Sequence, residues 1–545
     1  MADLLNSDFI RHRFVGGWGP DYGPSIDVLP ADGNIIRIPY LLQARNLIYL
    51  LNGGIRKMPG LDKLNSVALE SGAAIKGIFD YWISGASGTP LQHRILHVGT
   101  KIKKDDADGT FTDLFTGMTA GAVPVYSVMA DVLGMVNGSD APKTWDGSTA
   151  QSMAGTPPST LRWLVFHRNR WWGGGDNANQ SRVYYTNQLA VDWIGAGSGS
   201  IDVDSNDGDG CTGAISHKGE LIVFKGPYRG SIHRIQGSAP TGDDPFRLIS
   251  PYIKGVGSPT QNCIVPYNDD VVFLSNDGFI RSLNTTAAYG DFAEATLSLP
   301  INSWIVDHVN AGRLRHAQAR NWPQLGVVLF TLPVDGSSDP NCVLMMDYRN
   351  STTNAFGERQ QPVRWSLWDD LDTQAVSLGN VVDSSDNNRP ILMAGGSDGF
   401  LRRMGRPARS IDGSTALSYV AQTPYFSYAR PIEKKTIHVG AIGFAPKNNG
   451  AVTFGWTRDN NTQQTIDVNQ QGSGDVLGPA SLHPFTLDTS TLGGSAYVDS
   501  FFELDEGGDF RTISYEIRNS VLNEDVEIHT ISAGISKDGS WATEN

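Results

Sequence analysis

Three short stretches carry polar residues in patterns that catalysis or ion binding uses. The run GGSDG (395–399) has the spacing of a nucleophile elbow, in which a serine stands on a strand-to-helix turn. Here Phe400 and Leu401 continue into a strand, and no helical pattern follows. Ser397 is therefore predicted to lie in a hairpin turn and not to act as a nucleophile.

The second stretch, DVDSNDGDG (202–210), resembles the start of a calcium-binding loop. An EF-hand loop that began at Asp202 would need glycine at its sixth position and glutamate at its twelfth, where this chain has Asp207 and Gly213. Two interpretations remain open: an exposed acidic loop, which the failed template favours, and a loose cation site on Asp202, Asp204 and Asp207.

The third stretch is WSLWDDLD (365–372), with carboxylates at Asp369, Asp370 and Asp372. Glycosidases use carboxylate pairs, but all three lie at the end of one strand and no partner can be identified.

Weaker patterns favour structural roles. GAGSGS (195–200) lacks the third glycine of a dinucleotide-binding loop. His93 and His97 bracket a strand and form at best a weak metal pair. The aromatic cluster of Trp163, Phe166, Trp171 and Trp172 suits either carbohydrate stacking or a core, and the core is favoured because aromatics dominate cores. We predict no catalytic, cofactor or metal site, and no enzyme.

A basic cluster of Arg402, Arg403, Arg406 and Arg409 occupies a polar segment. The favoured role is pairing with acidic neighbours or with the next subunit. The alternative is a channel lining that contacts phosphate groups.

Composition limits the class of protein. The chain has 545 residues, 61 glycines and 18% charged residues, and its net charge is −14. An acidic chain is unsuited to coating nucleic acid, which needs a basic face. Cys211, Cys263 and Cys342 have no paired spacing and suggest buried thiols in a reducing compartment. The sequence shows neither a secretion signal nor an apolar run long enough to span a membrane, so we expect no membrane insertion.

β-strand patterns recur along most of the chain. The phrase VVFLSNDGFIRSL (271–283) is an apolar run, a tight turn and a second apolar run, and ILMAGGSDGFLRRMG (391–405) repeats it. Groups of three or four such strands, each roughly 35 to 55 residues long, match the blades of a β-propeller. A generic array of β-sandwiches is the alternative. We therefore predict an all-β fold, a divergent propeller of six or seven blades followed by a small β-sandwich. The expected limits are an N-terminal arm at 1–40, the propeller at 41–405, a linker at 406–416 and the sandwich at 417–545.

Four stretches carry a resemblance. In chain order they are NLIYLLNGGIRKMPGLDKL (46–64), IVFKGPYRGSIHRIQG (222–237), YIKGVGSPTQNCIVPYNDDVVFLSNDGFIRSL (252–283) and QTPYFSYARPIEKKTIHVGAIGF (422–444). They resemble corresponding stretches of the tail hub or nozzle proteins of short-tailed bacteriophages (podoviruses), also called packaged-DNA stabilisation proteins. The resemblance is collinear from about residue 40 to the end. The acidic loops at 104–109 and 202–210 have no counterpart.

The resemblance implies a structural virion protein. It implies a propeller body, six copies around the tail axis, an adaptor ring on the portal side, and a channel that closes on packaged DNA and opens for ejection. Tail fibre, tailspike or needle proteins would be further partners, with transient non-specific contact to viral duplex DNA. The protein would be assembled in the host cytoplasm and reside in the virion tail, with no catalytic motif and no cofactor. The alternative function is a propeller that binds or degrades glycans.

Overall fold

The computed structural model describes residues 8–26, 35–85, 88–106, 109–289, 296–349, 363–383, 388–428, 431–445, 451–459, 461–469, 498–503 and 509–537. They form two compact units. The propeller unit consists of Asp62–Met345 and Leu371–Gly405, and the sandwich unit of Met1–Leu61, Met346–Asp370 and Arg406–Asn545.

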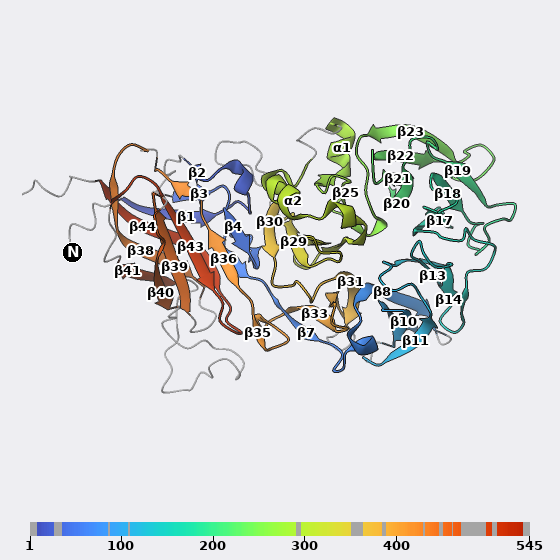
Figure 1. Ribbon diagram of the computed structural model, residues 1–545, viewed down its shortest axis with the longest axis horizontal. Coiled ribbons are helices and arrows are strands. Elements are labelled where there is room, and N and C mark those ends of the chain that lie inside the picture. The colour runs from blue at the N-terminus through green and yellow to red at the C-terminus, as the bar shows by residue number, and fades with distance from the viewer. Residues whose placement is uncertain are drawn as a thin grey trace, which may run out of the picture. The chain divides into compact units, whose positions relative to one another are not determined.

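Six sheets of the propeller unit are blades built from consecutive antiparallel strands (Figure 1). Their bounds are β8–β11 (Ile75–Ser84, Pro90–Val98, Lys101–Asp105, Phe111–Thr116), β12–β15 (Val125–Met129, Val132–Val136, Lys143–Trp145, Ala150–Ser152), β16–β19 (Trp163–His167, Arg170–Gly174, Arg182–Tyr185, Gly199–Asp202), β20–β23 (Gly210–His217, Glu220–Gly226, Ser231–Gln236, Arg247–Lys254), β24–β26 (Ile264–Tyr267, Asp270–Leu274, Ile280–Ser282) and β31–β33 (Ser377–Asp383, Arg389–Gly395, Leu401–Arg406). The predicted fold class, an all-β chain with a β-propeller and further β structure, is confirmed.

The first strand of each blade packs against the first strand of the next, which closes a ring. The contacts run β8, β12, β16, β20, β24, and from β31 back to β8. Between β24 and β31 the ring is completed by β27 (Gln318–Trp322), which continues into β28 (Val327–Leu332) and β29 (Cys342–Asp347). The last blade takes in β7 (Gly60–Lys63) beside β33, so it combines strands from both ends of the ring's sequence.

The two turns that share a sequence phrase share a conformation as well. Gly278 has φ of +85° between β25 and β26, and Gly399 has φ of +76° between β32 and β33. In the first turn the Gly278 amide donates to the Ser275 carbonyl at 3.0 Å. Glycine adopts positive φ without a steric cost, which is why both turns have glycine at this position.

The sandwich unit consists of two mixed sheets (Figure 1). The first has the order β3-β1-β44-β38-β41, with bounds Ile35–Ile38, Asp8–Phe14, Glu527–Lys537, Lys435–Phe444 and Val498–Glu503; β5 (Leu47–Tyr49), β6 (Ile55–Lys57) and β42 (Asp509–Phe510) pair at its sides. The second has the order β2-β37-β43-β36-β4-β30, with bounds Ser25–Ile26, Tyr425–Phe426, Ile513–Asn519, Tyr419–Gln422, Gln43–Arg45 and Arg364–Trp368; β39 (Ala451–Arg458) and β40 (Gln464–Asn469) continue from β43.

A layer of aromatic rings joins the two sheets. His12 of β1 lies with its ring centroid 4.7 Å from Phe426 and 5.5 Å from Tyr515, both on the second sheet. Its Nδ1 lies 3.3 Å from the Ile531 carbonyl and its Nε2 3.2 Å from the Tyr428 hydroxyl. Burial lowers the pKa of His12 to about 4, so the imidazole is a neutral core group near pH 7.

The contact-defined units differ from the expected domain limits. Residues of the expected N-terminal arm are strands of the sandwich, because β1 pairs with β44 along Asp8–Arg13. The propeller unit begins at Asp62 and not at residue 41, and it lacks Met346–Asp370, where β30 pairs with β4 through Leu367 and Arg45. The expected linker at 406–416 contains a two-stranded pairing of β34 (Ser410–Ile411) with β35 (Thr415–Ala416).

Helices are short in the described ranges. α1 (Leu283–Tyr289) and α2 (Asn302–His308) have seven residues each. Across the part of the chain that the structure describes, no helix has the length and apolar character needed to cross a membrane.

The two glycines make different demands on a substituted side chain. A Cβ at Gly399 would lie 2.7 Å from the Leu69 carbonyl oxygen and 3.0 Å from Gly72 Cα, whereas at Gly278 the nearest atom is a flexible methyl of Ile305 at 3.4 Å. We expect Gly278→Ala to lower the free energy of unfolding by about 1 kcal/mol through left-handed strain alone, and Gly399→Ala by about 3 kcal/mol. Chemical denaturation of both variants measures this. Equal losses would contradict the packing of the second turn against residues 69–72.

Candidate functional site

The predicted arginine cluster is largely neutralised within the chain. Arg402 is buried and its guanidinium donates to both carboxylate oxygens of Asp398, at 2.9 and 2.6 Å. Arg403 donates to Asp62 at 3.0 and 2.8 Å. These pairs lie in the propeller unit, and they match the favoured interpretation of acidic neighbours.

The other two arginines belong to the sandwich unit. Arg409 is buried and binds Asp525, with its Nε 3.0 Å from Oδ1 and its Nη2 3.2 Å from Oδ2. Arg406 is half-buried. A channel or subunit contact by any of the four stays a prediction.

The acidic loop at 202–210 is organised around a lysine. Lys225 of β21 is fully buried, and its Nζ donates to the carbonyls of Val203 and Asp204 at 2.7 and 2.8 Å and to Asp207 Oδ1 at 2.8 Å. Carbonyl and carboxylate oxygens are ligands that a hard cation prefers, and here an ammonium group takes the cation's place.

The remaining carboxylates of this loop have other partners. Asp202 pairs with Arg182 at 2.6 and 3.0 Å. Asp209 accepts the backbone amides of residues 228–230 at 2.7 to 2.9 Å. The three carboxylates of the loose cation site therefore do not converge on one point. No group of three or more His, Cys, Asp or Glu side chains in the described ranges is placed to hold a metal ion.

The carboxylates of Asp369 and Asp370 hold chain segments together. Asp369 accepts hydrogen bonds from Arg45 and from Asn46 Nδ2, the latter at 3.0 Å. Asp370 accepts from the backbone amide and the hydroxyl of Ser418. Burial raises the pKa of Asp370, and the bonds to Ser418 oppose that shift. Asp369 and Asp370 belong to the sandwich unit, so they do not form the pair that a propeller glycosidase would place at the ring's centre.

The minor motifs have structural roles. Ser397 lies in the β32–β33 turn and its amide donates to the Thr373 carbonyl at 2.8 Å, so the hairpin interpretation is confirmed. The 195–200 segment is a turn in which Ser198 donates back to Gly195. His93 contacts Asp106 at 2.7 Å, and His97 is buried. Cys211, Cys263 and Cys342 are buried free thiols.

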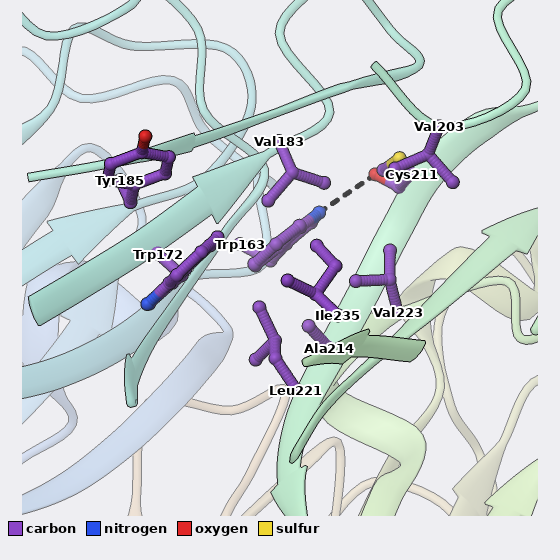
Figure 2. Packing of buried hydrophobic residues seen from close by; sticks show 10 residues of the cluster. All are labelled: Trp163, Trp172, Val183, Tyr185, Val203, Cys211, Ala214, Leu221, Val223 and Ile235. Atoms are coloured by element: carbon purple, nitrogen blue, oxygen red, sulfur yellow. Dashed lines mark hydrogen bonds between the residues drawn. The ribbon is translucent and has the colours of Figure 1, made fainter. Parts of the chain in front are cut away.

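The tryptophans of the aromatic cluster lie in two cores between blades, Trp163 and Trp172 in one and Trp171 in the other. Figure 2 shows Trp163 and Trp172 packed among Val183, Leu221 and Val223, which come from the blades β16–β19 and β20–β23. Trp163 Nε1 donates to the Cys211 carbonyl at 2.9 Å, which ties the first blade to the second. Trp171 is also fully buried, whereas Phe166 is 40% exposed. The core interpretation is confirmed for the three tryptophans.

A cavity of about 390 Å³ lies where the loops of several blades converge. We call it the axial cavity. Its lining comes from the blades that begin with β12, β16, β20 and β24 and from the segment just before β27: residues 119–123 and 125, 137–139, 162, 212, 259–262 and 315–316. Sequence reasoning missed this site, because its residues come from segments that share no motif.

Two side-chain amides donate hydrogen bonds between separate parts of the ring. Asn262 Nδ2 donates to the Pro124 carbonyl at 3.3 Å, which joins the entries of two blades that are not neighbours in the ring. Gln318 is buried and donates to the Lys76 carbonyl at 2.7 Å. Both bonds link segments that are not neighbours in the ring.

The electrostatic character of the axial cavity is set by Arg162 and Arg315. None of the residues that line it is Asp or Glu. Among described residues, neither arginine has a carboxylate oxygen within 4 Å, although Asp140 accepts from the lining residues Thr119 and Asn137. The cavity therefore presents guanidinium groups and amides, and no acid–base pair of carboxylates.

Comparisons with known proteins concern fold alone. No protein-family model matches the chain, and no curated protein matches its sequence. Similar solved structures include the computationally designed Ika8 protein, with a TM-score of 0.32 and 14% identity over 63% of this chain and 99% of that one. YCF48 from Cyanidioschyzon merolae gives a TM-score of 0.35 and 9% identity over 64% and 99%. The extracellular domain of the hybrid two-component system BT4673 of B. thetaiotaomicron gives 0.38 and 11% over 63% and 39%. At this similarity none of the three says what this chain binds or does.

The buried ammonium of Lys225 gives a test of the acidic loop. We expect Lys225→Met to lower the free energy of unfolding by about 3 kcal/mol, because it leaves a carboxylate, the buried carbonyl of Val203 and the half-buried carbonyl of Asp204 without their donor. Lys218→Met is the matched control, since Lys218 is exposed and its contact with Asp269 is 3.3 Å long at the surface. Thermal denaturation with and without about 5 mM calcium measures both. A wild-type protein that calcium stabilises strongly would contradict the internal-cation description.

Proposed function

We propose that this chain is a structural subunit of the tail of a short-tailed bacteriophage, a hub or nozzle that assembles as a ring of six copies. The proposal rests on the collinear resemblance, and the observation that supports it is a closed propeller whose polar constellations serve its own structure. The nucleophile-elbow serine, the acidic loop and the carboxylates at 369 and 370 all have structural partners. A rigid non-enzymatic building block has this character.

In this proposal DNA passes between copies of the chain and not through one propeller. The bond from Asn262 to Pro124 and the buried Gln318 occupy the interior of a single ring. A double helix, whose major groove alone is about 12 Å wide, cannot enter that space. A channel on the axis of six copies is the path that remains.

Charge supports passive conduction. With −14 per chain, six copies carry roughly −84, and an acidic wall does not hold phosphate. The internal pairing of Arg402, Arg403 and Arg409 agrees with this, because it takes three guanidinium groups away from the solvent. DNA would be retained by steric closure. The adaptor ring on the portal side and the fibre, tailspike or needle proteins belong to the same proposal, as does a location in the virion tail.

The second candidate function is glycan binding. The axial cavity favours binding over cleavage, because no carboxylate lines it. Polysaccharide cleavage by the purified protein that is abolished in Asp369→Ala and Asp370→Ala variants would replace the structural proposal with an enzymatic one.

Ring assembly is the direct test. One chain has a mass of 59.0 kDa, so a six-copy ring has roughly 354 kDa. We expect mass photometry to find this species, alone or with candidate tail partners, and negative-stain images to show six-fold rings. A protein that stays monomeric at micromolar concentration with every tail partner would contradict the hub proposal.

DNA affinity is an independent test of passive conduction. We expect the free protein to bind duplex DNA no more tightly than about 1 μM at physiological salt, the range of non-specific binding. Filter binding at several salt concentrations measures the affinity and its slope. Sub-micromolar binding would show that the channel grips DNA if the slope of log affinity against log salt corresponds to several neutralised phosphates and the Arg406→Ser variant binds less tightly.

A further inference from the structure

We infer that the axial cavity of the propeller binds an oxyanion, a carboxylate or a phosphate group on a small ligand or on an acidic side chain of a neighbouring copy. The inference goes beyond the tail-hub proposal and does not depend on it. It rests on the lining of the cavity, on the charges around it and on the neutral side chains that accept hydrogen bonds from its two arginines.

The first observation is the sign of the lining. Arg162 and Arg315 reach the cavity from different blades, and no carboxylate is among the lining residues. Both arginines are exposed, and neither is within 4 Å of a carboxylate oxygen in the described part of the chain. In a chain with 43 basic and 57 acidic residues, two such guanidinium groups in one cavity are an uncommon arrangement. Asp140, behind Thr119 and Asn137, offsets part of this positive charge.

The second observation is how Arg315 is held. Its Nε donates to His316 Nε2 at 3.1 Å, so that nitrogen carries no proton and the proton is on Nδ1. His316 Nδ1 lies 3.5 Å from Asp339 Oδ1, and the same oxygen is 2.6 Å from Lys76 Nζ. Burial, together with the charge of Arg315, lowers the pKa of His316 and keeps the ring neutral. The Nε edge of the guanidinium is thereby oriented, and its two Nη groups can donate hydrogen bonds to a ligand.

Arg162 is oriented in a similar way. Its Nη2 donates to Asn177 Oδ1 at 3.0 Å, a neutral acceptor that leaves the positive charge uncompensated. Guanidinium groups recognise carboxylate and phosphate through paired N–H donors, and pre-orientation lowers the entropy lost on binding. A cavity of about 390 Å³ is at the small end of ligand pockets, which fits a compact organic acid or a phosphate ester.

The test is titration of the full chain with inorganic phosphate and with citrate, by isothermal calorimetry at constant ionic strength. We expect a dissociation constant below about 1 mM for at least one of the two. Arg162→Gln and Arg315→Gln should each weaken it at least tenfold. Arg313→Gln is the matched control, because Arg313 is an exposed arginine on the same 3-10 helix (Ala311–His316) outside the lining, and it should leave the affinity unchanged.

Two further measurements identify the source of the anion and guard against misfolding. Each variant is first compared with the wild type in thermal denaturation. If Arg315→Gln fails to fold, it is replaced by Arg315→Lys, which keeps the charge. If free anions do not bind but Arg315→Gln breaks up an oligomer that Arg313→Gln leaves intact, the oxyanion is a neighbour's carboxylate. No binding up to about 10 mM together with unchanged assembly, or equal losses in the control, overturns the inference. The mass of a six-copy ring of the wild-type protein is measured separately, so the hub proposal and this inference can fail independently.

Discussion

The packing of β8 against β31 is the constraint on which the propeller depends, because a ring that failed to close would leave two blade faces in water. An apolar cluster fills this seam with Ile75 and Ile78 on one side and Val381 and Met393 on the other. Polar bonds fix its register: Ser377 Oγ donates to the Ile75 carbonyl at 2.7 Å. Across the same seam, buried Arg94 lies 3.0 Å from Asp105 and 3.8 Å from Asp383.

Positive charge in this chain serves mainly to hold strands in place. Arg403 links Asp62 of β7 to Asp383 of β31, Lys225 fills an oxygen-lined cage, and Arg409 is buried against Asp525. Removing either member of such a pair leaves a buried charge without its partner, so substitution of one residue alone is strongly destabilising. Arg162 and Arg315 of the axial cavity differ from these paired residues, because they face solvent and no buried carboxylate among the described residues needs their charge.

Local features were predictable and long-range ones were not. The turns at Gly278 and Gly399 followed from the chemistry of their residues, and the tryptophan core followed from its composition. The contact-defined units differ from the expected domain limits, because the pairing of β1 with β44 and of β30 with β4 joins segments that are far apart in the sequence. For the same reason the sequence of the acidic loop did not predict its contact with Lys225, which comes from the neighbouring blade. The axial cavity could not be anticipated, since ring closure alone defines its lining.

The pairing of β1 with β44 has a consequence for biosynthesis. His12 and Ile531, which hydrogen-bond in the folded sandwich, are 519 residues apart. At a translation rate of about 5 to 20 residues per second, β1 waits roughly half a minute to two minutes for its partner. The propeller blades from β8 to β26 can form meanwhile, strand by strand, as they leave the ribosome. During that interval the β1 edge is open to pairing with other nascent chains, and a product truncated before β44 keeps it open permanently. Only chains that extend through β44 can therefore form the paired sandwich sheet, so synthesis of β44 is itself a checkpoint on which copies fold fully.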